Sequence, residues 1–301
     1  MSAMFVSAVV GLAMGNVAPS LLRTMVTRGV EASLVVAVWA LTMCATVISI
    51  ALPVLGELVR RCSLASREVS PGGVESVAAV VSAVLLGFAV IRGGWVLWRS
   101  GRERHRLHGR HVELARLLTG ARPDAGGVLW LPASEPLAYS VAGAPPLVVL
   151  TSGVTQRLDR AAVDAVLAHE RSHLRRGHHL LVDAAHAAAA GMSWLPLMRQ
   201  SPSLIRTLVE LDADAQAARQ HGCGGLRRAL EELAGAPAPR AALGMTGECT
   251  RLRLARLESG RSTGRGPLAG SATAACGAAM LGSMLAFVAF TMTALVSCAA
   301  F

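Results

Sequence analysis

DRAAVDAVLAHERSH, at residues 159–173, is the most informative segment of this 301-residue chain. Its alanines, valines and leucine follow Asp159 and predict a helix that runs directly into His169 and His173. Residues four positions apart project from one face of a helix, about one turn from each other. Two imidazoles at that spacing can bind one Zn²⁺ ion, so the segment predicts a metal site on a helix.

Glu170 follows the first histidine and completes an H-E-x-x-H pattern. Its carboxylate is expected beside the two imidazoles, where it can take a proton from water and later deliver it to a leaving amine. We therefore expect Glu170 to be the general base of a metal-assisted amide hydrolysis. The alternative is a charged helix with two exposed histidines, which leaves their metal-binding spacing unexplained.

A catalytic zinc needs a third protein ligand, and two residues compete for that role. His179 lies six residues after His173, where the pattern H-E-x-x-H-x-x-G-x-x-H places its third histidine. That pattern requires glycine at position 176, whereas this chain has arginine there and glycine at the next position. Glu210 is the favoured ligand, because its separation from His173 leaves room for an intervening helix and a return of the chain.

Glu210 and Asp214 are four positions apart on a helix expected from about Ser203 to Gln220. Both can face the metal, Glu210 as a ligand and Asp214 as the acceptor for the outer N–H of a ligating histidine. Asp212 lies well around the helix from Glu210, so we expect it on a solvated acidic face.

The composition indicates a membrane protein, with 53% apolar residues, 16% charged residues and a mean hydropathy of +0.49. A soluble domain carries about 25% charged residues. Long uncharged runs predict four transmembrane helices, at about 4–22, 32–56, 75–98 and 271–301. We therefore expect three membrane helices within residues 1–98, a polar domain at 99–270 and a fourth membrane helix at 271–301.

Arginine supplies all of the Lys+Arg charge, because the chain has no lysine. Near the predicted span ends, arginines gather at 23–28, 99–110 and 256–265 more than at 60–67. The positive-inside rule then predicts a cytoplasmic domain at 99–270 and both termini outside the cell membrane. Nucleic acid is not an expected partner, because the arginines do not form a stripe interleaved with stacking aromatics.

Short apolar runs at Val128–Leu131 and Leu147–Thr151 predict strands of a small sheet. Between them, residues 138–142 are expected either to form an edge strand that holds an extended peptide or to form a purely structural hairpin. Tyr139 is a candidate for substrate contact. Residues 101–122 and 226–233 predict helices, and Arg251–Arg256 predicts a basic helix along the cytoplasmic membrane surface.

Several smaller features carry less information. Gly11 and Gly15 form a G-x-x-x-G pattern that could dock the first span on another helix, but chance is the favoured interpretation. The cysteines are scattered without a C-x-x-C pair, which argues against a cysteine metal site; a disulfide between Cys62 and Cys298 is left open. His178, like His179 and His186, is expected to be a packed or surface residue rather than a ligand.

The H-E-x-x-H pattern, followed by Glu210-x-x-Ala213-Asp214 and flanked by membrane spans, resembles a known family. It is similar to the BlaR/MecR-like membrane zinc metallopeptidases and to the related HtpX-like and CAAX-prenyl endopeptidases. Three spans before the motif and one after it match the BlaR/MecR-like arrangement. The resemblance implies a mostly helical, gluzincin-type peptidase domain with a small sheet.

By position, the resemblance implies that His169, His173 and Glu210 bind zinc, that Glu170 is the base and that Asp214 supports the site. The sequence departs from the family in two ways. An extracellular penicillin-binding domain does not follow the fourth span, so direct sensing of β-lactams is not expected. Where many relatives have an acidic residue soon after the second histidine, this chain has Gly177-His178-His179.

The favoured function is that of a membrane-anchored zinc endopeptidase that cleaves a protein at the cytoplasmic face, with a winged-helix transcriptional repressor as the substrate suggested by the family. One alternative is HtpX-like quality control of membrane proteins. Another is a signal transducer with an inert metal site. The expected partners are a protein substrate and the lipid bilayer, and a homo-oligomer is left open.

Overall fold

The computed structural model describes residues 3–64, 73–119, 127–233 and 247–259. Within them, most residues are helical and three strands form one small sheet. The described residues divide into two compact units. The first holds the chain up to Trp95 together with Ala185–Pro202, and the second holds Val96–Ala184 and the residues from Ser203 onward.

Three helices are long and apolar enough to cross a membrane, which indicates a membrane protein. They are α1 (Ala3–Thr27), α2 (Ala32–Leu64) and α3 (Gly73–Thr119). The predicted third span, 75–98, and the helix predicted at 101–122 both lie in α3 as far as Thr119. No proline interrupts residues 73–119, so both form one continuous helix. The fourth predicted span, 271–301, and Cys298 lie outside the described residues.

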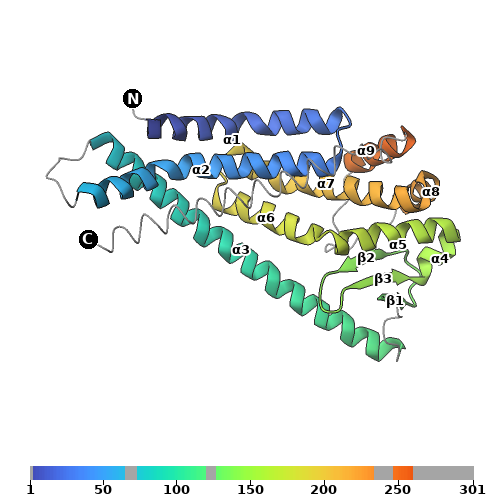
Figure 1. Cartoon of the computed structure of the whole chain (residues 1–301). Coiled ribbons are helices and arrows are strands. Elements are labelled where there is room, and N and C mark those ends of the chain that lie inside the picture. Colours follow the sequence, from blue (N-terminus) through green and yellow to red (C-terminus); the bar gives the residue numbers. More distant parts are fainter. Residues whose placement is uncertain (1–2, 65–72, 120–126, 234–246, 260–301) are drawn as a thin grey trace. The chain divides into compact units, whose positions relative to one another are not determined.

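Helices α1 and α2 run side by side in the first unit (Figure 1). The two glycines of the G-x-x-x-G pattern lie at close contacts there. A Cβ atom at Gly11 would be 2.7 Å from the Cβ of Ser49 on α2, and one at Gly15 would be 2.7 Å from the Cδ2 of Leu195. A side chain at Gly11 would clash with α2, which favours a packing role over chance at this position.

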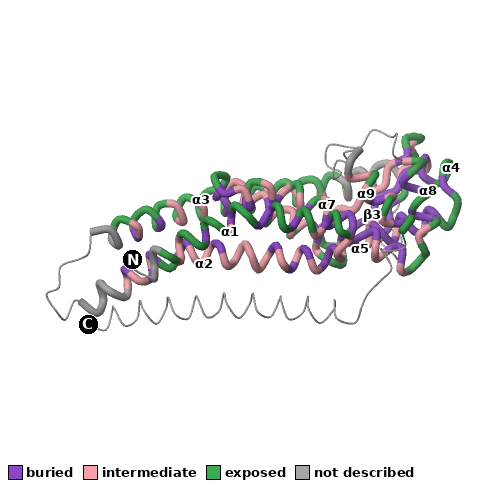
Figure 2. Tube along the Cα trace, turned by 90° about the horizontal axis from the view of Figure 1, so that it is seen from above, coloured by how far each residue is buried: buried purple, intermediate pink, exposed green. Residues whose placement is uncertain are grey.

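The sheet of the second unit confirms the predicted strands. It consists of β1 (Val128–Leu131), β2 (Ala138–Val141) and β3 (Leu147–Thr151), in the order β1-β3-β2. β3 is central and wholly buried, parallel to β1 and antiparallel to β2. Figure 2 shows this buried strand near α5 (Arg160–Arg175). β2 is an edge strand of the described sheet and contacts α5.

Helix α5 packs on one face of the sheet through apolar side chains. Val163 and Val166 join Val148 and Leu150 of β3 in one core cluster. At its start, Asp159 caps the helix, because its carboxylate accepts a hydrogen bond of 2.8 Å from the Ala162 amide. The helix that presents the two histidines is therefore fixed both by its cap and by the sheet beneath it.

The other face of α5 packs against later helices of the chain. Ala165 and Ala168 share a cluster with residues of α7 (Pro196–His221), α8 (Cys223–Leu233) and α9 (Gly247–Glu258). Alanines at the contact let α7 approach α5 closely, which brings the acidic residues of α7 to the histidines. The short helix α4 (Ser152–Arg157) follows β3 and leads into α5.

Gly177 ends α5 and reverses the chain. Its φ of +62° lies in the left-handed region that residues with a Cβ rarely adopt, and its amide donates to the carbonyl of Leu174. Helix α6 (His178–Gly191) therefore begins immediately after the turn. This places His178 only five residues after His173, at the end of the site helix.

Candidate metal centre

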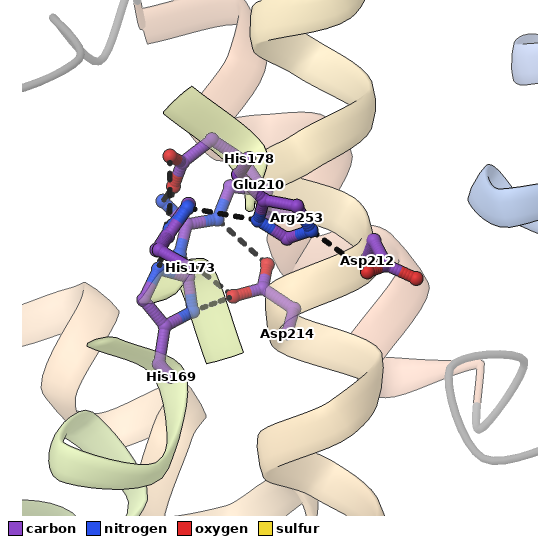
Figure 3. Close-up of polar contacts among 7 residues, drawn as sticks. All are labelled: His169, His173, His178, Glu210, Asp212, Asp214 and Arg253. Atoms are coloured by element: carbon purple, nitrogen blue, oxygen red, sulfur yellow. Dashed lines mark hydrogen bonds and ion pairs between the residues drawn. The ribbon is translucent and has the colours of Figure 1, made fainter. Parts of the chain in front are cut away.

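The structure brings together the three residues that the sequence proposed as metal ligands. His169 and His173 project from α5, and Glu210 comes from α7. One ligand atom of each lies within 4.8 Å of those of the other two, and all three side chains are buried. Figure 3 shows the imidazoles and the carboxylate converging from the two helices.

The spacing of the ligand atoms fits a tetrahedral metal site. The two Nε2 atoms are 3.1 Å apart. The Glu210 oxygens lie 3.5 Å from the Nε2 of His169 and 3.5 Å from the Nε2 of His173. Tetrahedral ligands held at zinc-binding distance lie about 3.3 Å from one another. The donor set of two imidazoles and one carboxylate therefore fits zinc and leaves a fourth position open.

Asp214 lies behind the first histidine. Its Oδ1 is 3.0 Å from the Nδ1 of His169, the ring nitrogen that points away from the ligand cluster. An acceptor at this nitrogen fixes the tautomer and leaves the Nε2 lone pair for a metal. The geometry matches the supporting role expected for Asp214, whose side chain is buried.

Arg253 of α9 holds the two carboxylates together. Its guanidinium donates to both oxygens of Asp214, at 2.6 and 2.7 Å, and its Nη1 is 2.9 Å from Glu210. The prediction that residues 251–256 form a surface basic helix is wrong at this position, since Arg253 is only 3% exposed. Its i, i+4 spacing to the buried Leu257 was the signal in the sequence that places it on an inward face.

Charge explains the ionisation of this part of the site. Burial opposes ionisation of Glu210, but the positive charge of Arg253, together with the neighbouring His169 and His173, more than offsets it and lowers the pKa of that carboxyl below its ordinary value. The pKa of Asp214 is lowered in the same way, against its burial. Both carboxylates are thus charged at neutral pH and can act as a ligand and as an acceptor.

The second histidine has a different partner. The Nδ1 of His173 lies 2.9 Å from the Nδ1 of His178, whose Nε2 lies 3.0 Å from the Oδ2 of Asp212. The same Asp212 oxygen is 2.5 Å from the Nε of Arg176. The prediction of a solvated Asp212 is therefore wrong, because its side chain is buried against a histidine and an arginine. His178 is a packed residue rather than a ligand.

Glu170 belongs to α5, and its side chain lies between this helix and the edge strand β2. Burial raises the pKa of Glu170, and the neighbouring side chain of Ser140 on β2 is among the groups that oppose this shift. Sequence reasoning did not select Ser140. Side chains alternate along a strand, so Ser140 and Tyr139 point to opposite faces of the sheet.

Tyr139 packs on the face away from α5, with Leu129 and Val149. It therefore does not reach the metal centre from the face where Ser140 meets Glu170, and it is not supported as a substrate contact there. His179 belongs to α6 and is not part of the metal-binding group found among the described residues. Glu210 takes the third position in that group.

Comparisons with known proteins bear on the same segment. Residues 131–235 match the model of peptidase family M48. The chain is also 32% identical over 104 residues to the plastoglobule-localized metallopeptidase 48, chloroplastic, of Arabidopsis thaliana. That match covers 35% of this chain and 29% of the relative, so the chain spans under a third of the relative's length. No solved structure matches the chain significantly.

The matched segment includes all three metal-binding candidates and Glu170, but it ends before Arg253. Both matches point to metallopeptidases, and neither of them names the BlaR/MecR-like group. Residues 131–235 are thus similar to the metallopeptidases of family M48, in a chain with three helices suited to a membrane.

Proposed function

We propose that the protein is a membrane-anchored, zinc-dependent endopeptidase that hydrolyses peptide bonds of a protein substrate at the cytoplasmic face. The convergence of His169, His173 and Glu210 on one point is the observation that carries this proposal. Two imidazoles, one carboxylate and an open fourth position are typical of catalytic zinc sites. The likeness to family M48 supports the same class of reaction.

The proposed mechanism assigns the proton transfers to Glu170. A zinc ion held by the three ligands would polarise the substrate carbonyl and the attacking water. Glu170 takes a proton from this water as the new C–O bond forms, and delivers it to the amide nitrogen as the C–N bond breaks. Its raised pKa suits a group that first accepts and then donates a proton, and the neighbouring Ser140 hydroxyl is placed to orient its carboxylate.

Strand β2 is the proposed binding site for the substrate backbone. It is an edge of the described sheet and contacts α5, which carries Glu170. An extended peptide can add to such an edge through main-chain hydrogen bonds. Ser140 then lies in the same strand that holds the peptide, so substrate binding and the base are coupled through one element.

The proposed substrate and the proposed orientation of the chain in the membrane are inferred from the sequence. The distribution of arginines supports a cytoplasmic peptidase domain with both termini outside. The BlaR/MecR-like resemblance suggests signalling through cleavage of a winged-helix repressor. An HtpX-like role in quality control is the second candidate, and it is supported by the same motifs. A protease with one defined cytoplasmic target favours signalling, whereas cleavage of many unrelated misfolded membrane proteins favours quality control.

A Glu170→Gln variant tests the mechanism. We expect it to retain bound zinc, because the three ligands are untouched, but to cleave casein about 10²- to 10⁴-fold more slowly than the native chain. The measurements are elemental analysis and a cleavage assay on the full chain in detergent. Glu232→Gln, on the exposed side of α8, is the matched control and should cleave at the native rate. Unchanged cleavage by the Glu170 variant would reject the proposed mechanism, whereas a zinc-loaded native chain that cleaves nothing would favour the inert transducer.

A further inference from the structure

His178 and Asp212 form a buried pair that the proposed reaction does not use. Their side chains belong to residues that are 2% and 5% exposed. His178 starts α6 and Asp212 lies on α7, so the pair joins two elements directly behind α5. Burying a histidine and a carboxylate is costly unless every polar atom finds a partner.

The contacts determine where each proton must be. If the Nε2 of His173 presents its lone pair to a metal, its Nδ1 carries the ring proton and donates. The acceptor 2.9 Å away is the Nδ1 of His178. That nitrogen must then be unprotonated, so the proton of a neutral His178 sits on its Nε2. The Oδ2 of Asp212, 3.0 Å from this Nε2, is the acceptor that holds it there.

Asp212 thus fixes the tautomer of His178, and His178 fixes the tautomer of His173. If Asp212 were absent, the His178 proton could move to Nδ1, where two N–H groups would face each other across 2.9 Å. His173 would then rotate or change tautomer, and the direction of its Nε2 lone pair would change. The supporting residues of metal-binding histidines commonly act in this way.

We propose that His178 and Asp212 are positioning residues that orient His173 for metal binding through the chain Asp212–His178–His173. The inference rests on the proposed metal site, but not on its catalytic activity. It predicts the strength of metal binding by the protein itself. Neither residue touches the substrate or the reacting atoms in this assignment.

The decisive experiment compares His178→Phe with His178→Asn in the full chain in detergent. Phenylalanine fills the buried space but removes the acceptor. Asparagine keeps an oxygen near the position of Nδ1. We measure the Kd for Zn²⁺ by competition with a chromophoric chelator, and record the visible absorption of the Co²⁺-loaded proteins. His179→Phe, at the next position of α6, is the matched control.

We expect His178→Phe to bind Zn²⁺ about 10- to 100-fold more weakly than the native chain. His178→Asn should bind about tenfold more tightly than His178→Phe, because one hydrogen bond to His173 is restored. The Co²⁺ spectrum should change in the phenylalanine variant and return toward the native spectrum with asparagine. A general packing role would not produce this rescue. His179→Phe should match the native chain in both measurements.

Two results would overturn the proposal: a native Kd for His178→Phe, or equal values for the phenylalanine and asparagine variants. A double variant extends the test. Asp212→Leu alone should weaken Zn²⁺ binding, but added to His178→Phe it should cause little further loss, because Asp212 acts through His178. Fully additive losses would contradict the chain of contacts.

Failure of the proposed function has a different signature. If the native chain binds no stoichiometric Zn²⁺, the metal site itself is wrong. If the native chain binds Zn²⁺ but Glu170→Gln cleaves normally, the catalytic assignment fails while the His178 comparison remains valid.

Discussion

Asp214 contacts His169 directly, whereas His173 meets a second histidine, His178, behind which Asp212 lies. On the His169 side every supporting group is charged, since Arg253 of α9 is paired with the carboxylates of Asp214 and Glu210. On the second side the His178 ring lies between His173 and Asp212, and Asp212 is paired with the partly exposed Arg176. Each histidine of the motif thus has a hydrogen-bond acceptor at its Nδ1. For His169 this acceptor is the carboxylate of Asp214, and for His173 it is the imidazole of His178.

This difference indicates on which side of the site a substitution should destabilise the protein most. On the His169 side two buried carboxylates share one buried guanidinium, and loss of Arg253 leaves both of them uncompensated. On the His173 side the outermost cation, Arg176, is about one-third exposed, so water can replace it. Substitutions on the first side should therefore affect folding as well as metal binding, and those on the second side should affect mainly metal binding.

Replacing Arg253 should have the largest effect. Arg253→Leu leaves the Glu210 and Asp214 carboxylates buried without their cation, so we expect a loss of about 3 to 5 kcal/mol in the free energy of unfolding of the metal-free chain. Denaturant unfolding in detergent, followed by circular dichroism, measures it. Arg251→Leu, exposed on the same helix, is the control and should be near native. A native unfolding curve for Arg253→Leu would remove the basis for the comparison.

Replacing Asp214 should have the next largest effect. Asp214→Asn removes the charge behind His169 and one partner of Arg253, so we expect Zn²⁺ to bind about 10- to 100-fold more weakly. Chelator competition measures the Kd under the same conditions as for His178→Phe. Because Asp214 is charged and in direct contact, its loss should exceed that of His178→Phe. The reverse order would show that the neutral relay is the stronger of the two supports.

Local signals in the sequence explain the parts of the fold that could be predicted. Asp159, the alanines and valines after it and the two apolar runs at 128–131 and 147–151 each specify an element by neighbouring residues, and the structure has those elements. The length of α3 was not predicted. A change from apolar to basic residues moves the helix from lipid into water, but it does not end the helix. Gly101 and Gly109 have open space around them, so neither marks an end.

The candidate site was predictable where helical spacing alone determines a contact. His169 with His173, and Glu210 with Asp214, share a face by spacing, and the structure brings both pairs together. Whether these residues bind metal and catalyse remains a prediction. The role of Asp212 was misjudged because helix periodicity gives an angle around α7 and not the identity of the element that covers it. His178 covers that position only because Gly177 reverses the chain.

Replacing Arg176 should have the smallest effect and is the sharpest test of the difference between the two sides. Arg176→Ala removes a partly exposed cation from Asp212, but His178 keeps its acceptor. Such ion pairs contribute about 0 to 1 kcal/mol, so the unfolding free energy should change by no more than that and the Kd for Zn²⁺ by less than about fivefold. Arg175→Ala, exposed at the preceding position, is the control. A loss of Zn²⁺ affinity as large as that of His178→Phe would mean that Asp212 needs a cation as Asp214 does, and the two sides of the site would then work by the same principle.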